Sequence, residues 1–129
     1  MKEIMAMVRL NRVNATKEAL AEAGFPAFTC SKVMGRGKKT FNASLVETVL
    51  GDGELPVSSV GEYFTESARL IPKRYFTIIV PEDDVEKAVN TIMETNCTGN
   101  PGDGKIFVLP IIESVRIRDG ELQMDSESY

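Results

Sequence analysis

The 129-residue chain contains no histidine, so it lacks the commonest catalytic base and the commonest protein ligand of transition metals. Its two cysteines, Cys30 and Cys97, lie far apart and belong to no Cys-x-x-Cys pair or metal-ligand cluster. No apolar run reaches secretory length or the roughly 18 residues of a membrane-spanning helix. These absences exclude several enzyme classes and predict a cytoplasmic protein without a bound metal or membrane insertion.

The chain also lacks a concentrated basic surface. Its net charge is −4, and its Lys and Arg residues are scattered apart from a short cluster at Arg36, Lys38 and Lys39. Nucleic-acid binders usually need clustered cations to neutralise phosphates, so nucleic acid is not an expected partner. The apolar fraction of 43% and the charged fraction of 26% are typical of one soluble globular domain.

Hydrophobic periodicity predicts the order strand, helix, strand, strand, helix, strand. In the first strand, Ile4, Ala6 and Val8 share one face. The predicted elements are strands over 3–10, 25–33, 73–80, 105–109 and 112–118, the last completing a short final hairpin, and helices over 11–23 and 81–95. This order indicates an α+β fold, a ferredoxin-like βαββαβ sandwich.

A long segment between Gly37 and Pro72 shows no sustained period. Connections longer than about 12 to 15 residues are uncommon in compact domains, so this one is either functional or disordered. It contains an apolar group that could form one or two helical turns against a partner: Leu45, Val46, Val49 and Leu50. At the other end, the acidic residues from Asp119 onward indicate a mobile tail, so we place the domain at 1–120 and a flexible tail at 121–129.

The strongest local signal for chemistry is the segment from Thr98 to Lys105, which contains Gly99, Gly102 and Gly104. Glycines let backbone amides converge on an anion, and Lys105 supplies a charge for phosphate oxygens. The spacing is not that of a Walker loop, and taken alone a plain turn explains the same residues.

Two further groups of residues bear on an anion site. Strand alternation predicts that Arg116 and Arg118 share a face while Ile117 points inward, although a solvated edge strand explains this pattern as well. Together with Lys105, the two guanidiniums could neutralise a polyphosphate. The segment 35–39, Gly-Arg-Gly-Lys-Lys, could also approach a ligand, or it could be an ordinary glycine exit from a strand.

Three anchors of the sequence resemble the PII family, also called GlnB-like proteins, over residues 1–120. They are Glu-Ala-Leu-Ala-Glu-Ala-Gly at 18–24 leading to Gly-Arg-Gly at 35–37, Thr-Gly at 98–99 through Gly-Asp-Gly-Lys-Ile-Phe at 102–107, and Arg-Ile-Arg at 116–118. The resemblance implies a ferredoxin-like trimer with ATP or ADP in each cleft between subunits. It also implies that 2-oxoglutarate joins MgATP at the base of a long T-loop, here about 37–72.

The resemblance also implies roles for individual residues. Those that match ATP or ADP positions are Gly102, Asp103, Gly104 and Lys105 around the phosphates, Arg116 and Arg118 from across the subunit boundary, Gly35, Gly37 and Lys38 on the other side, and Thr29, Thr77 and Ile79 near adenine. Lys73 matches the lysine that pairs with 2-oxoglutarate. Lys39 stands where most of the family has glutamine, and it adds a second cation for that anion.

The inserted loop resembles the nitrogen-fixation-associated branch of the family, and specifically its longer-loop paralogue. Such proteins work as paralogue pairs that inhibit dinitrogenase directly, so we expect a homotrimer or a mixed oligomer, with the apolar group at 45–50 as the partner contact. Two alternatives are a regulator of an ammonium transporter or another nitrogen enzyme, and a small ATP-using phosphotransferase. The last lacks an evident nucleophile or base, so no enzymatic activity is expected.

Overall fold

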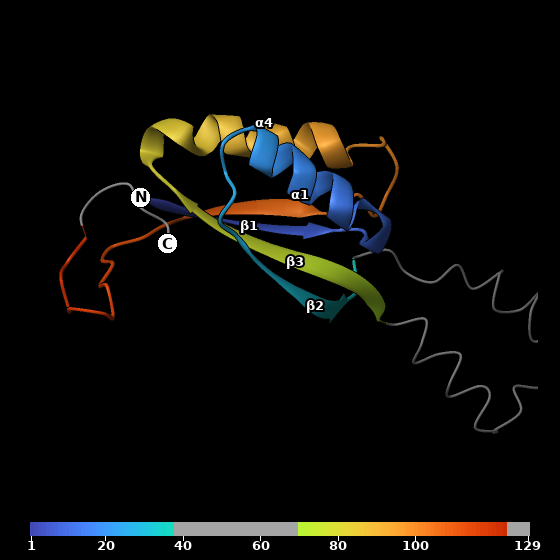
Figure 1. Ribbon diagram of the computed structural model, residues 1–129. Helices are drawn as coiled ribbons and strands as arrows, with labels where there is room; N and C mark the ends of the chain where they lie inside the picture. Colours follow the sequence, from blue (N-terminus) through green and yellow to red (C-terminus); the bar gives the residue numbers. More distant parts are fainter. Residues whose placement is uncertain (38–69, 124–129) are drawn as a thin grey trace, which may run out of the picture. The chain divides into compact units, whose positions relative to one another are not determined.

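A computed structural model describes residues 1–37 and 70–123 (Figure 1). In chain order the elements are β1 (Lys2–Val8), η1 (Leu10–Arg12), α1 (Val13–Glu22), β2 (Thr29–Gly35), β3 (Ile71–Val80), η2 (Glu82–Asp84), α4 (Val85–Asn96) and β4 (Lys105–Pro110). This βαββαβ order confirms the predicted α+β, ferredoxin-like fold. The chain divides into two units, residues 1–33 with 73–129 and residues 34–72, and the description below concerns the first.

The sheet has the strand order β2-β3-β1-β4. Its central strand β1 pairs antiparallel with β3 on one side and with β4 on the other, so that Ile4 lies opposite both Ile78 and Val108. This register brings Lys105 at the start of β4 beside Met7 near the end of β1. The end of β1 therefore lies next to the segment that enters β4.

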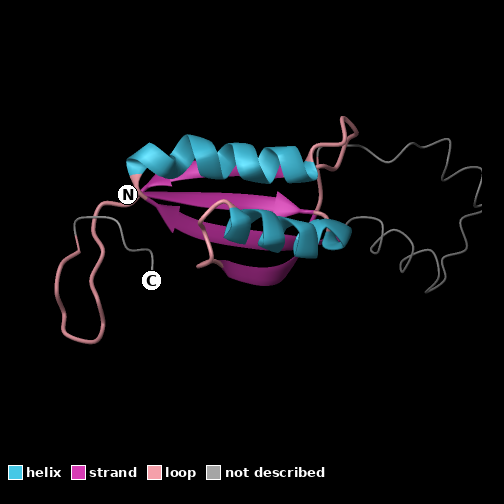
Figure 2. Ribbon diagram, turned by 45° about the horizontal axis from the view of Figure 1, so that its top comes forward, coloured by secondary structure: helices cyan, strands magenta, loops and turns pink. Residues whose placement is uncertain are grey.

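The hydrophobic core lies between the sheet and the two helices, which cover the same face of it (Figures 1 and 2). Ile4, Ala6 and Val8, which were predicted to share one face of the strand, are each at most 1% exposed. Leu20 on α1 is also fully buried, and burying such a side chain contributes about 1.5 to 3 kcal/mol. The two helices are joined by a buried hydrogen bond.

That hydrogen bond links the C-terminal end of α4 to the middle of α1. Asn96 Nδ2 donates to Thr16 Oγ1 over 3.1 Å and to the carbonyl oxygen of Ile92 over 2.9 Å. Because both polar side chains are buried, this pairing avoids the penalty of an unsatisfied polar group. It fixes the position at which α4 ends and the glycine loop begins.

Two boundary predictions were wrong. The strand expected over 25–33 begins only at Thr29, because Pro26 has no backbone N–H and the amide of Phe25 donates to the carbonyl of Leu20 at the end of α1. The strand expected over 112–118 is a single bridge between Val115 and Leu122. Ile117 is therefore 100% exposed instead of pointing inward.

The other predicted segments have different outcomes. The helical turns expected near Leu45 to Leu50 lie outside the described residues, as do most of the predicted T-loop and residues 124–129. The boundary at 120/121 stays a prediction, although Leu122 takes part in the bridge to Val115. Among the described residues, no helix is long and apolar enough to cross a membrane.

Candidate functional site

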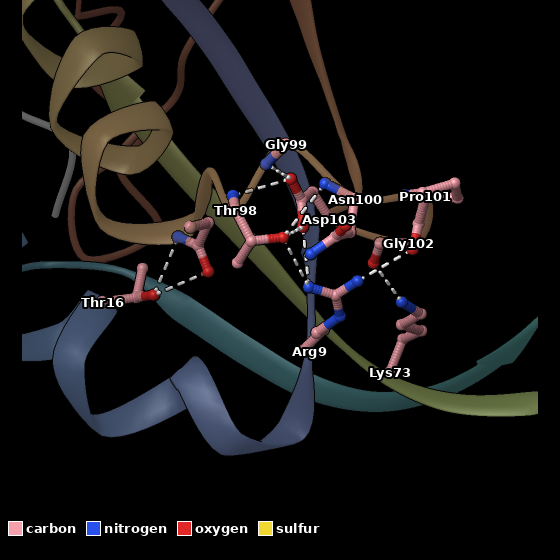
Figure 3. Close-up of polar contacts among 10 residues, drawn as sticks. Arg9, Thr16, Lys73, Thr98, Gly99, Asn100, Pro101, Gly102 and Asp103 are labelled. Carbon is pink, nitrogen blue, oxygen red and sulfur yellow. Dashed lines mark hydrogen bonds and ion pairs between the residues drawn. The ribbon is translucent and has the colours of Figure 1, made fainter.

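The glycine loop, residues 98–104, connects α4 to β4 (Figure 3). Cys97 ends α4 by taking an extended conformation. Three of the next seven residues, Gly99, Gly102 and Gly104, have positive φ angles of 79°, 97° and 112°. Residues with side chains rarely adopt these values, so the glycines allow the loop to turn tightly here.

The carboxylate of Asp103 holds the loop together. It accepts hydrogen bonds from the backbone amides of Thr98 and Gly99 over 2.8 and 3.0 Å and from the hydroxyl of Thr98. The hydrogen bonds from the hydroxyl and amide of Thr98, followed by smaller contributions from Gly99 and Arg9, lower the pKa of Asp103 from 3.8 to about 2. Asp103 is therefore ionised at neutral pH and braces the loop from within.

Arg9, just after β1, clamps the same loop from outside. Its Nη1 donates to Asp103 Oδ1 over 2.6 Å and to Thr98 Oγ1 over 3.3 Å, and its Nη2 donates to the carbonyl oxygen of Pro101 over 2.9 Å. The fork shape of a guanidinium suits such several-point contact. Sequence reasoning missed Arg9, since its partners are about 90 residues away and only the pairing of β1 with β4 brings them close.

Lys73 lies beside the loop as well. Its Nζ donates to the carbonyl oxygen of Gly102 over 2.7 Å. Its pKa is lowered mainly by desolvation and next by the positive charge of Arg9, while Asp103 opposes the shift. The structure thus brings the lysine predicted to bind 2-oxoglutarate against the loop predicted to bind phosphate.

Two backbone amides of the loop are available for a ligand. Within residues 1–37 and 70–123, the amides of Gly102 and Asp103 have no hydrogen-bond acceptor. Successive free amides in a turn form a concave site for an anion. Lys105 follows at the start of β4, where its side chain is exposed and its Nζ lies 5.5 Å from the centre of the Phe107 ring.

Glycine is required at the end of the loop by close backbone contact. A Cβ atom on Gly104 would lie 1.8 Å from the carbonyl oxygen of Met7, whereas one on Gly102 would lie 3.1 Å from Nη2 of Arg9. The first neighbour is the backbone of the central strand and cannot move freely. The second is the end of a flexible side chain.

In the part of the chain that the structure describes, Thr77 and Ile79 have no recorded hydrogen bond or ion pair with the loop. Thr77 and Ile79 alternate with the buried Phe76 and Ile78 along β3, so their side chains lie on the sheet face away from the helices. Thr29 is exposed at the first position of β2. Their contact with a nucleotide stays a prediction.

The arginines near the C-terminus lie in the small hairpin. Arg116 donates from Nε to Asp119 Oδ2 over 2.9 Å and from Nη2 to Glu121 Oε2 over 2.7 Å, so its charge is balanced locally. Arg118 lies in the turn of the same hairpin. The predicted action of both residues across a subunit boundary stays a prediction.

The basic segment before the T-loop divides between described and undescribed residues. Gly35 ends β2, and Gly37 follows it in the unit of residues 34–72. Lys38, Lys39 and the apolar group at 45–50 lie outside the described residues. In the part of the chain that the structure describes, no three His, Cys, Asp or Glu side chains gather as metal ligands.

Comparison with known proteins gives consistent matches over almost the whole chain. The family model described as nitrogen regulatory protein P-II matches residues 1–121. "Nitrogen fixation nifHD region GlnB-like protein 2" of Methanobacterium ivanovii is 39% identical over 127 residues, covering 98% of both chains. Its namesake from Methanothermococcus thermolithotrophicus is 42% identical over 123 residues, covering 94% of both.

Two further matches extend this result. "Nitrogen fixation nifHD region GlnB-like protein 1" of Methanothermococcus thermolithotrophicus is 40% identical over 121 residues, covering 94% of this chain and 97% of the relative. The crystal structure of Arabidopsis thaliana PII bound to citrate is similar with a TM-score of 0.68 and 29% identity, covering 99% of this chain and 90% of that one. The same fold and the same sequence family are thus found by independent comparisons.

Proposed function

Because the chain belongs to the nitrogen regulatory protein P-II family, we propose that it is a nitrogen sensor that binds ATP or ADP at its glycine loop. In this proposal 2-oxoglutarate is a second effector, and the T-loop contacts dinitrogenase and inhibits it. The chain acts as a homotrimer or in a mixed oligomer with a paralogue. The family is one of regulatory proteins, and we propose that this member has no enzymatic activity of its own.

The observation that carries nucleotide binding is the geometry of the glycine loop. Asp103 and Arg9 fix its shape, while the amides of Gly102 and Asp103 have no acceptor among the described residues. A phosphate chain needs both amide donors and positive charge. Lys73, which contacts the loop in space, and Lys105, which directly follows it in the sequence, supply that charge.

The position of Lys73 supports 2-oxoglutarate as the second effector. Among the described residues, its ammonium group donates to one carbonyl oxygen, that of Gly102. A carboxylate could replace this oxygen as a stronger, charged acceptor. The citrate-bound Arabidopsis protein has the same fold, and citrate also carries carboxylates. Because the carboxylate of Asp103 is already engaged, Mg²⁺ would be held by phosphate and effector oxygens instead of by that residue.

The names of the relatives support dinitrogenase as the target. They belong to the nifHD region of methanogenic archaea, and both GlnB-like protein 1 and GlnB-like protein 2 match this chain. We propose that the apolar residues Leu45, Val46, Val49 and Leu50 contact the enzyme. A loop exposed to water gains little from such residues unless a partner covers them.

The proposal is tested with purified dinitrogenase and its reductase in an acetylene reduction assay. Addition of the chain together with its paralogue should lower activity, and MgATP with 2-oxoglutarate should restore it. A reaction rate that does not change with the added proteins would contradict the inhibitory role. Thermal unfolding of each component before the assay shows whether the proteins are folded.

Two other functions make different predictions in simple assays. A regulator of an ammonium transporter would bind that transporter from membranes in a nucleotide-dependent way and would leave dinitrogenase active. A small phosphotransferase would turn over ATP steadily, and this activity would depend on Lys105 but survive removal of residues 38–69. We favour the regulator of dinitrogenase because of the nif relatives.

A further inference from the structure

A polar pocket lies between α1, the start of β2 and the start of β3. It shares no residue with the glycine loop. Its volume is about 590 Å³, within the range of about 300 to 1,000 Å³ that is typical of small-molecule sites. The lining residues are Leu10, Val13, Asn14, Lys17, Phe28, Cys30 and Arg74. All of them belong to the first structural unit, residues 1–33 with 73–129.

Arg74 is the unusual residue of this pocket. It alternates with Lys73 along β3 and lies on the same face as the buried Phe76 and Ile78, which is the face that the helices cover. Its Nε atom is buried and has no hydrogen-bond partner. A guanidinium on a partly buried, otherwise apolar face needs a hydrogen-bond acceptor, because an unsatisfied buried donor is costly.

A second cation faces the same pocket without a counter-charge. Among the residues that the structure describes, neither Lys17 nor Arg74 takes part in an ion pair. The lining contains no Asp or Glu. Within residues 1–37 and 70–123, these two positive charges are therefore not neutralised by an ion pair, in contrast to Arg9 and Arg116, which each pair with a carboxylate.

The rest of the lining gives the pocket a mixed character. Asn14, three residues before Lys17 on α1, adds a side-chain amide to the lining. Val13 and Phe28 form an apolar wall and also pack against the core. Sites for small organic ligands commonly combine such a wall with a few polar groups that fix orientation. An inorganic ion would leave the apolar wall without a contact.

From this arrangement we propose that the pocket binds a small organic anion, in which a carboxylate or phosphate group meets Lys17 and Arg74 and an apolar part lies against Val13 and Phe28. This site is separate from the proposed nucleotide site. Its binding does not require that the glycine loop binds ATP. A regulator with both sites could respond to a metabolite in addition to nucleotide and 2-oxoglutarate.

Cys30 provides a direct readout because its thiol is free and lines the pocket, whereas Cys97 is free, exposed and outside the pocket. The intact chain is alkylated with iodoacetamide, and the rate at each cysteine is followed by peptide mass spectrometry. The probes are phenyl phosphate and benzoate, which separate a phosphate from a carboxylate source, with neutral phenol as the control. At ten times its Kd for this pocket, an occupying anion should slow alkylation of Cys30 about tenfold. Slower alkylation of Cys97, which lines a cavity with Asp103 and Lys105, reports binding at the glycine loop instead.

Substitutions separate this pocket from the glycine loop. Lys17→Gln, at an exposed position of α1, and Arg74→Gln should each raise the Kd of the anion at least about tenfold, as expected for loss of a charge-assisted contact. At the same anion concentration, the protection of Cys30 should then fall from about tenfold to about twofold or less. Lys73→Gln, on the opposite face of β3, should keep the protection although it alters the glycine-loop site. The proposal is overturned if neither anion protects Cys30, if phenol protects it equally, or if Lys17→Gln leaves protection unchanged.

Discussion

Replacement of Gly104 by alanine tests the link between loop geometry and nucleotide binding. The added Cβ would lie 1.8 Å from the carbonyl oxygen of Met7, and this contact must open to at least 3.0 Å. The φ angle of 112° adds backbone strain for any residue other than glycine, which costs about 1 to 3 kcal/mol. Since Met7 belongs to the central strand, the loop must move instead of the strand.

The expected result is a loss of ATP affinity with the fold retained. If the loop shift that relieves the clash with Met7 removes an amide contact to a charged phosphate, worth about 1.5 to 3 kcal/mol, affinity falls about 10- to 150-fold. Isothermal titration calorimetry measures the affinity. A thermal melt measures the accompanying destabilisation, which should lower the Tm by several degrees.

Two matched glycines serve as controls for Gly104→Ala. Gly99, in the same loop, and Gly24, after α1, also have positive φ angles of 79° and 95°, but an added Cβ would have no atom within 4 Å at either position. Gly99→Ala and Gly24→Ala should therefore show the backbone strain without the clash and keep most of the ATP affinity. If folded Gly104→Ala binds ATP as tightly as the wild-type chain, the glycine-loop reasoning is refuted.

Three further predictions concern other residues of the site. Arg9→Met should weaken ATP binding about tenfold, because the contacts of Arg9 with the loop are lost. Arg9→Lys should retain only part of the wild-type affinity. Equal ATP affinity in the wild-type chain and both variants would contradict a positioning role. The pKa of Asp103 is lowered to about 2, so the stability it contributes is complete above about pH 4 and is lost as the pH falls toward 2. In thermal melts across this range, the Tm of Asp103→Asn should fall less steeply with decreasing pH than that of the wild-type chain. An unchanged dependence of Tm on pH would contradict the stabilising role of this carboxylate. Replacing the apolar residues at 45–50 with serine should weaken inhibition of dinitrogenase while ATP affinity measured by calorimetry stays the same, and undiminished inhibition would show that this group is not the contact.

The sequence predicted the central parts of the fold because strong local patterns determine them. The alternation predicted that Ile4, Ala6 and Val8 share one face of β1, and in the structure all three are buried on that face. This pattern reflects contact with one apolar layer. Such residues can be recognised without knowledge of their distant partners.

The errors arose where contacts from elsewhere decide the conformation. Alternation suggested a strand around Ile117, but the hydrogen bonds of Arg116 with Asp119 and Glu121 favour a tight hairpin. Similarly, nothing near Arg9 in the sequence indicated its role, since the clamp exists only after β1 pairs with β4. The glycine loop was found from its composition, whereas the internal role of its carboxylate followed only from the structure.

Calorimetric titration of the wild-type chain with ATP and ADP tests most directly whether the glycine loop binds an adenine nucleotide. We expect saturable binding of at least one of the two nucleotides, and a weaker heat signal in Gly104→Ala measured under the same conditions. Absence of any saturable heat with either nucleotide, from protein that melts cooperatively, would contradict nucleotide binding at the loop.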